Sequence, residues 1–244
     1  MIYQGKCYWI IGASEGLGRA LAQAMDAQGA VLVLSARSAD RLQDVAQGLR
    51  QASVLPMDVS DSASVAAAAA QLPPLDGVIY CVGLYDPMKA QDWRVPASVA
   101  MCEANFVGAV RVLGHVVPDF ARRQAGHVVL IGSLGGFRGL PGAIGYGASK
   151  AALMHLAENM AADLGRSGVR VQLVNPGYIR TRLTEKNSFA MPQIMEPEAA
   201  AAHVMRAMAG NRFQTSFPRP FSWLFILARF VPEALYYRIF GRKG

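Results

Sequence analysis

The chain has 244 residues, of which 52% are hydrophobic and 17% are charged, a composition that excludes a disordered protein and suits a single α/β domain with one sizeable core. The net charge is +7, but no basic reading module is recognisable, so no nucleic-acid partner is expected. The three cysteines and four histidines lack metal-ligand spacing, which predicts no metal site and favours a reducing cytoplasmic location. The charge-free apolar stretch 220–228 is too short for a membrane span.

Apolar runs alternate with amphipathic helical patterns along most of the chain. The runs predict buried strands at 6–12, 31–36, 53–59, 76–82, 127–132, 169–175 and 213–217. The patterns between them predict helices at 16–28, 38–50, 61–72, 98–124, 146–166 and 196–209, with Ser38 as an N-cap. This alternation is typical of βαβ units, and predicts a doubly wound, Rossmann-type parallel sheet in a three-layer α/β/α domain.

A glycine-rich turn follows the first predicted strand and opens the first predicted helix. Its sequence runs from Gly12 to Gly18 with the spacing G-x-x-x-G-x-G. Glycines allow a tight turn and a close backbone approach to a diphosphate, which the helix N-terminus then attracts. The residues of this turn expected to bind a dinucleotide are Gly12, Ser14, Gly16, Leu17 and Gly18.

The end of the second predicted strand indicates which dinucleotide is preferred. An acid there would bind the ribose 2′-hydroxyl, but the sequence is Ser35-Ala36-Arg37-Ser38. Arg37 can instead pair with a 2′-phosphate through its forked donors, which favours NADP, with NAD as the alternative. Glu15 in the glycine turn works against this preference, because a carboxylate there would repel the same phosphate.

Ser133, Tyr146 and Lys150 form a candidate catalytic group. Tyr146 and Lys150 are four residues apart in a predicted helix and so share one face, while Ser133 follows the fifth strand at the edge where ligands bind. A nearby ammonium would lower the pKa of the phenol from about 10, so that Tyr146 could exchange a proton with a carbonyl or alcohol oxygen. The Ser133 hydroxyl could hold that oxygen.

Together these features resemble the classical short-chain dehydrogenase/reductase family over residues 5–210. The matching positions, in the family's order, are the glycine turn, Asp58-Val59, Asn105, Ser133, Tyr146-x-x-x-Lys150 and Pro176-Gly177. The resemblance implies that Asn105 supports a water linking Lys150 to solvent, and that Lys150 also binds the nicotinamide ribose. It further implies coenzyme contacts by Asp58, Val59, Gly83, Tyr146, Pro176, Gly177, Ile179 and Thr181.

One position departs from the family pattern. After the fourth strand the family has Asn-Asn-Ala-Gly or a similar sequence, whereas this chain has Tyr80-Cys81-Val82-Gly83. Gly83 keeps the close backbone approach, but the amide side chain that braces the neighbouring strands is lost. This change weakens local rigidity and adenosine contacts and removes no catalytic group.

Two regions beyond the coenzyme motifs bear on the substrate. Residues 178–195 are expected to form the substrate loop, within a domain spanning 1–218. A helical tail, 219–244, follows, and Pro232 divides it into two parts, the second a helix at 233–240. Residues 206–244 hold seven of the Lys/Arg residues, one acid and nine aromatic residues. The tail could pack on the body or a second subunit, contact an anionic membrane surface, or cover an apolar substrate.

The sequence therefore predicts an NADP-dependent oxidoreductase that moves hydride between nicotinamide and an apolar carbonyl compound or secondary alcohol, with Tyr146 as general acid and base. A 3-oxoacyl-carrier-protein-type reductase is an alternative, with the basic tail docking an acidic carrier. An alternative of another class is a non-catalytic nucleotide-sensing or scaffolding protein. The family resemblance implies a homodimer or homotetramer.

Overall fold

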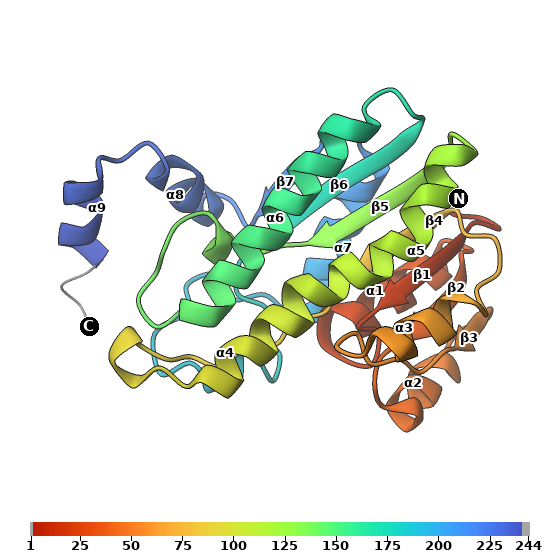
Figure 1. Ribbon diagram of the computed structural model, residues 1–244, viewed down its shortest axis with the longest axis horizontal. Helices are drawn as coiled ribbons and strands as arrows, with labels where there is room; N and C mark the ends of the chain where they lie inside the picture. The colour runs from red at the N-terminus through yellow and green to blue at the C-terminus, as the bar shows by residue number, and fades with distance from the viewer. Residues whose placement is uncertain (1, 241–244) are drawn as a thin grey trace.

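All paired strands run parallel in one seven-stranded sheet (Figure 1). This computed structural model describes residues 2–240, and the last four residues of the expected tail, 241–244, lie outside the described part. The strand order is β3-β2-β1-β4-β5-β6-β7. The strands are β1 Cys7–Ile11, β2 Val31–Ser35, β3 Ala52–Val54, β4 Gly77–Tyr80, β5 Gly126–Ile131, β6 Val169–Pro176 and β7 Gln214–Phe217.

Helices cover both faces of this sheet, which confirms the expected three-layer, doubly wound architecture (Figure 1). On one face lie α1 Gly16–Ala27, α2 Ala39–Ala46 and α7 Pro197–Ala209. On the other lie α3 Ser62–Ala69, α5 Gly108–Arg122 and α6 Ile144–Leu164, with α4 Val95–Cys102 packed against α6. The tail forms α8 Phe221–Ala228 and α9 Glu233–Phe240, separated near Pro232 as expected.

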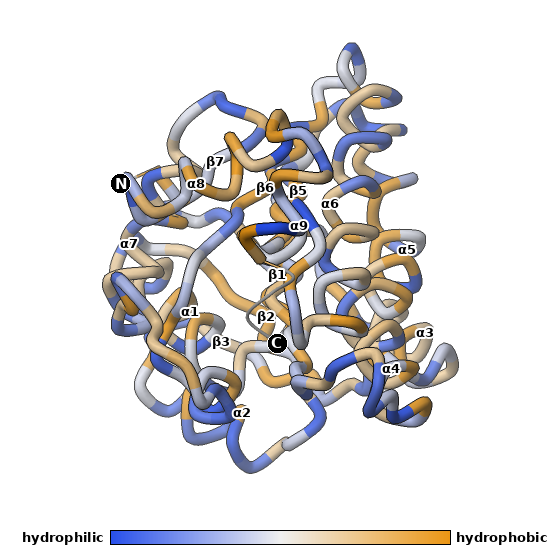
Figure 2. Tube along the Cα trace, turned by 90° about the vertical axis from the view of Figure 1, so that its left-hand side faces the viewer, coloured by the Kyte–Doolittle hydropathy of each residue, from blue (hydrophilic) through white to orange (hydrophobic). Residues whose placement is uncertain are grey.

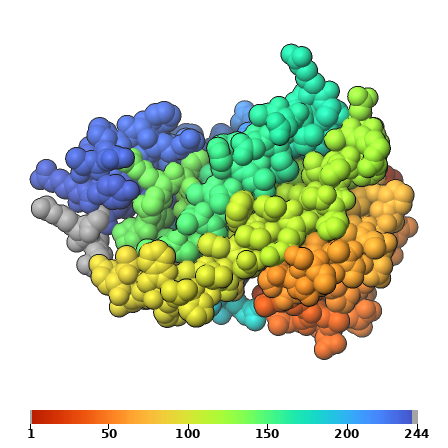
Figure 3. All heavy atoms as spheres, viewed as in Figure 1, coloured from red at the N-terminus to blue at the C-terminus, as the bar shows by residue number. Residues whose placement is uncertain are grey.

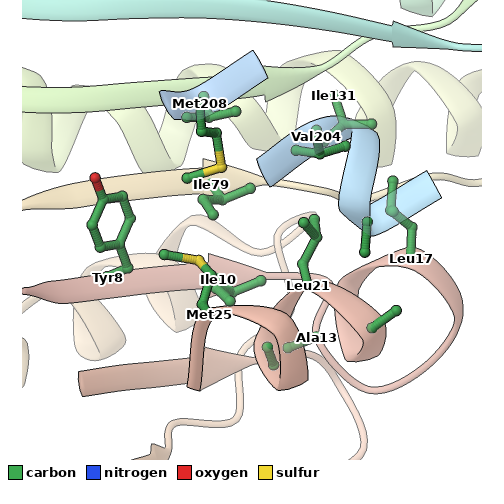
Figure 4. Close-up of a cluster of buried hydrophobic side chains, with 14 of the residues drawn as sticks. Tyr8, Ile10, Ala13, Leu17, Leu21, Met25, Ile79, Ile131, Val204 and Met208 are labelled. Carbon is green, nitrogen blue, oxygen red and sulfur yellow. The ribbon is translucent and has the colours of Figure 1, made fainter. Parts of the chain in front are cut away.

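The two cores follow from the alternation of side chains along the strands. In β1, Tyr8 and Ile10 belong to the core beneath α1 and α7, whereas Trp9 and Ile11 belong to the opposite core. Figure 4 shows the first of these, in which side chains of α1 and α7 meet those of β1, β4 and β5. Because both faces of each central strand are buried, the strands read as continuous apolar runs.

Two elements differ from the sequence expectation. β3 ends at Val54 rather than at residue 59, although Leu55 still donates to the Leu34 carbonyl of β2 and Met57 to the Ala36 carbonyl just beyond it. Pro56 lies between them, just past the end of this edge strand of the sheet, where a residue without an N–H is tolerated. The helix expected at 98–124 begins earlier, at Val95, because Pro96 in its first turn is preorganised for helix. A π-helical segment, Glu103–Val107, interrupts it.

This long helix is also apolar enough to be compared with a membrane span. Residues 95–122 run as one helical stretch of 28 residues, which contains 18 consecutive residues with a mean hydropathy of 1.2, so by length and composition alone it could cross a bilayer. In the structure Val112, Val116 and Phe120 of this stretch are buried in a core of the domain. The stretch therefore serves as a core helix of this fold.

Candidate active site

The strand order reverses between β1 and β4, and a large cavity opens at that point. It has a volume of about 870 Å³ and lies at the carboxyl ends of the strands. Ligands bind at such switch points in open α/β sheets. The cavity is lined by the sequence-predicted residues Gly12, Ser14, Gly16, Leu17, Gly18, Arg37, Asp58, Val59, Gly83, Ser133, Tyr146, Lys150, Pro176, Gly177, Ile179 and Thr181. Asn105 is the one predicted site residue that does not line it.

The glycine turn has the backbone that a diphosphate cradle needs. Gly12 has a φ of +89°, and a Cβ there would lie 3.0 Å from the carbonyl of Cys81. A Cβ on Gly18 would lie 2.0 Å from the Gly12 oxygen, so only glycine lets α1 start this close to β1. No side chain caps the N-terminus of α1. Its first N–H groups can therefore point at an anion.

The end of the cavity next to β2 and β3 is lined by Arg37 and Asp58. Burial raises the pKa of Asp58, but hydrogen bonds from Ser60 and the charge of Arg37 outweigh it and hold that pKa below its ordinary value. Glu15 forms an ion pair with Arg41 at 3.1 Å and another with Arg182. These two guanidinium groups offset the negative charge of the Glu15 carboxylate in the cavity lining.

Ser133 and Tyr146 face each other at the opposite end of the cavity. The Ser133 hydroxyl accepts from the Gly135 N–H at 3.1 Å and lies close enough to the Tyr146 phenol to lower the pKa of that group. Burial raises the pKa of Tyr146, the Ser133 hydroxyl lowers it in part, and Tyr178 raises it further. Tyr85 packs edge-on against Tyr146, with ring centroids 5.0 Å apart.

Lys150 is buried one helical turn after Tyr146. Its ammonium donates to the Ile131 carbonyl at 2.9 Å and to the Val82 carbonyl at 3.1 Å, and so joins the ends of β5 and β4. Burial lowers the pKa of Lys150 to about 8, against a smaller opposite effect of Cys81. The expected lowering of the Tyr146 pKa by this ammonium is wrong for this structure, because burial outweighs other influences on the phenol.

Asn105 is fully buried in the π-helical segment. Its side-chain amide donates to the Leu84 carbonyl and the Ser149 hydroxyl, both at 2.9 Å, and its oxygen accepts from the Leu84 N–H at 2.6 Å. Asn105 therefore fixes the chain after β4 against α6, next to the turn that carries Tyr146.

Several cavity residues are not evident from the sequence reasoning. Arg41 lies in the first turn of α2, just after the N-cap Ser38, and adds a second cation to the part of the cavity that Arg37 lines. Phe221 and Phe225 of α8 line the cavity, but their distance in sequence from every motif hides this. Arg138 and Arg180 do not line the cavity and are engaged elsewhere, Arg138 with the tail carbonyls and Arg180 with Glu196.

Comparisons with known proteins agree with this architecture. Residues 6–191 match the profile of the family described as "short chain dehydrogenase". An "Uncharacterized oxidoreductase" of Myxococcus xanthus is 31% identical over 235 residues, which is 93% of each chain. A solved "short chain dehydrogenase/reductase family protein" is 30% identical with a TM-score of 0.82, over 88% of this chain and 97% of that one.

A further solved structure shows the fold alone, because its identity is 22%. It is a short chain dehydrogenase of Burkholderia cenocepacia J2315 in complex with NADP, with a TM-score of 0.87 over 97% of this chain and 98% of that one. The profile match spans most of the sequence, and the relative from Myxococcus aligns nearly end to end. The chain is thus an oxidoreductase that belongs to the short-chain dehydrogenase/reductase family.

Proposed function

We propose that this oxidoreductase is NADP(H)-dependent and interconverts an apolar carbonyl compound and its secondary alcohol. The observation that carries the proposal is the convergence of Ser133, Tyr146 and Lys150 with the glycine turn on one cavity. A scaffold that only senses a nucleotide has no use for a phenol and a serine hydroxyl paired at the far end of a dinucleotide-sized cleft. We therefore set the non-catalytic alternative aside.

The residues present fit a dinucleotide. The uncapped start of α1 and the side-chain-free surface of Gly12 would hold the diphosphate, and Arg37 with Arg41 would hold a 2′-phosphate. Thr181 lies across the glycine turn, where a Cβ on Gly16 would come within 2.9 Å of its methyl group. When bound, the nicotinamide would supply or accept the hydride.

The chain's own residues would then manage the proton. The Ser133 hydroxyl would hold the substrate oxygen, and the Tyr146 hydroxyl would donate a proton to it during reduction. The raised pKa of Tyr146 keeps the phenol protonated at neutral pH, which suits a donor. Lys150 joins the ends of β4 and β5 through its bonds to the Val82 and Ile131 carbonyls. Its pKa of about 8 allows the amine to carry a positive charge near neutral pH.

The substrate end of the cavity supports the apolar assignment. Tyr85, Leu140, Leu183, Phe189 and Phe221 line it, and none of these five side chains carries a charge that could select a polar group. We propose that residues 178–195 enclose the substrate together with Phe221 and Phe225, the two tail residues that line the cavity.

The first test is the Tyr146→Phe variant. Its kcat should fall by about 10²- to 10⁴-fold, because the proton donor is removed, while the Kd for NADPH stays unchanged. Tyr85→Phe is the matched control, since it removes the neighbouring hydroxyl, which donates to Asn187 at 2.8 Å, and should keep most of the turnover. A panel of apolar ketones with NADPH supplies the substrates. A Tyr146→Phe enzyme with near wild-type kcat would refute the role of the phenol.

A second candidate is reduction of a 3-oxoacyl group on an acidic carrier protein. The observation that favours it is the basic character of the tail, with Arg229 placed over the Phe137 ring beside the cavity. Such docking would be electrostatic and lost at high salt. The two candidates separate by kcat/KM on carrier-bound and free 3-oxoacyl substrates, at low and high ionic strength.

We also propose a homodimer or homotetramer built on the two long helices, α5 and α6. Val110 of α5 is a large apolar side chain exposed on this face, which supports a contact there. Sedimentation velocity of the purified chain gives the assembly directly, and a Val110→Glu variant should shift it toward the monomer.

A further inference from the structure

Most of the exposed apolar side chains come from segments that also supply residues to the cavity lining. Among residues 2–240, fourteen large hydrophobic side chains are exposed, and twelve of them come from three segments that border the cavity. The segments are residues 93–99, the substrate loop at Phe189 and the tail from 223 to 240. The members are Trp93, Val95, Val99, Phe189, Trp223, Leu224, Leu227, Phe230, Leu235, Tyr237, Ile239 and Phe240. We name this set the apolar rim.

The rim occupies one end of the molecule. In Figures 1 and 3 the tail and the segment leading into α4 both lie at the end opposite β2 and β3. Figure 2 looks onto this end, with α9 near the centre between α8 and α4. Phe230 is 81% exposed and Leu224 is 66% exposed, so the domain itself does not bury these side chains. Such a concentration marks a surface that contacts another apolar phase or molecule.

A small set of contacts positions the tail so that it presents this surface. Arg138 lies over the Tyr236 ring at 3.9 Å and donates to the Val231 carbonyl at 2.7 Å. The Tyr236 hydroxyl donates to the Gly139 carbonyl at 2.8 Å. These contacts tie α9 to the loop after Ser133, so the rim has a defined position next to the reactive end of the cavity.

Helix α8 separates the cavity from the outside with apolar groups on both sides. Phe221 and Phe225 line the cavity, whereas Trp223, Leu224 and Leu227 are exposed. An apolar molecule could therefore move from an apolar phase on one side of α8 to the cavity on the other without crossing a charged layer. This arrangement suits a substrate that enters the cavity from an apolar phase rather than from water.

The positive charges of the tail indicate which partner would bind at the apolar rim. In its described part, Arg219, Arg229 and Arg238 stand against a single acid, Glu233. A second copy of the chain would bring these arginines toward their own counterparts, whereas anionic lipid headgroups would neutralise them. Aromatic and aliphatic side chains flanked by arginines are the composition of an interfacial membrane contact.

We propose that the apolar rim docks on the surface of an anionic lipid bilayer and opens the cavity toward it. The substrate is then an apolar carbonyl compound or alcohol dissolved in that bilayer, an assignment that rests on the proposed function. The docking itself does not require turnover, so the two can fail separately.

Vesicle sedimentation of the full chain tests the docking. The wild-type chain should pellet with vesicles of phosphatidylglycerol and phosphatidylcholine, and much less with phosphatidylcholine alone or at high salt. The triple variant Leu224→Glu, Leu227→Glu, Phe230→Glu should lose binding by at least about tenfold, because it puts carboxylates into the rim. Ile2→Glu, at an exposed apolar residue away from the rim, should bind as the wild type does.

Two further measurements make the result decisive. All variants should reduce a water-soluble ketone at the wild-type rate, since the three substituted residues are exposed, but the triple variant should lose activity on a vesicle-embedded ketone. Failure of the wild type to bind anionic vesicles overturns the proposal. It is equally overturned if the triple substitution only converts a dimer to a monomer, or only weakens binding of an acidic carrier protein. Absent activity on any ketone would refute the proposed function and leave the docking intact.

Discussion

At the scale of single residues, Lys150 and Tyr146 show how burial tunes a site. Both groups are shifted by desolvation, which lowers the pKa of the amine to about 8 and raises that of the phenol. The phenol is thereby kept as a proton donor, and the amine is held by the carbonyls of Val82 and Ile131. The sequence spacing predicts that these groups are neighbours. It does not reveal the two carbonyls, which come from strands far away in the chain.

The preference for NADPH over NADH is predicted to depend on the guanidinium group of Arg37. Arg37→Ala should raise the KM for NADPH by about 10- to 100-fold, because a charge-assisted hydrogen bond to a phosphate is lost, and should leave the KM for NADH nearly unchanged. Steady-state kinetics with both coenzymes measures this. Arg166→Ala, at an exposed arginine outside the cavity, serves as the control. Equal losses for NADPH and NADH would contradict a role in 2′-phosphate binding.

At the scale of elements, the order of strands and helices could be predicted because each central strand is a continuous apolar run. The same logic found the glycine turn and the group around Tyr146, which adjoin strand ends. It failed where long-range contacts decide the outcome. The side-chain bonds of Asn105 to Leu84 and Ser149 depend on how α6 packs, and the role of α8 as a cavity wall depends on where the tail folds.

The buried side chain of His127, which links three strands, predicts how the stability of the fold depends on pH. His127 of β5 hydrogen-bonds Tyr8 of β1 at 2.9 Å and Gln172 of β6 at 2.8 Å. Burial, then Arg170, lowers its pKa to about 4, with Gln172 acting weakly in the other direction. The folded state thus binds fewer protons than the unfolded state between about pH 4 and pH 6.5, and stability is lost as the pH falls through that window.

The free energy of unfolding of the wild type should therefore fall, relative to that of His127→Gln, by about 3 kcal/mol between about pH 7 and pH 4. Urea unfolding at the two pH values measures both chains. The His127→Gln variant lacks the titrating imidazole, so its own change in stability between the two pH values measures the effect of all other titrating groups. A difference between the two chains that is the same at both pH values would show that His127 does not titrate as described.

At the scale of the whole molecule, the tail is joined to the domain through few contacts. Arg138 supplies the main one, by stacking on Tyr236 and donating to the carbonyls of Ala228 and Val231. Most of the apolar surface of α8 and α9 contributes nothing to the core, so the attachment of these helices depends strongly on that side chain.

Arg138→Ala should loosen the tail without unfolding the domain. Amide hydrogens of residues 221–240 should exchange at least about tenfold faster, while those of β4 and β5 keep their protection. Hydrogen exchange read by mass spectrometry resolves the two regions. Arg180→Ala, which breaks the ion pair with Glu196, is the control and should leave tail exchange unchanged. Unaltered tail exchange in Arg138→Ala would mean that other contacts hold these helices.

The central claim is that the Tyr146 hydroxyl and the Ser133 hydroxyl hold the oxygen of a substrate beside the reactive carbon of a bound nicotinamide. A crystal structure of the chain with NADP and an unreactive alcohol or ketone tests it most directly. The account predicts the nicotinamide ring at the Tyr146 end of the cavity, with the ligand oxygen hydrogen-bonded to both hydroxyl groups. A nicotinamide bound elsewhere, or a Tyr146 hydroxyl directed away from the ligand oxygen, would contradict it.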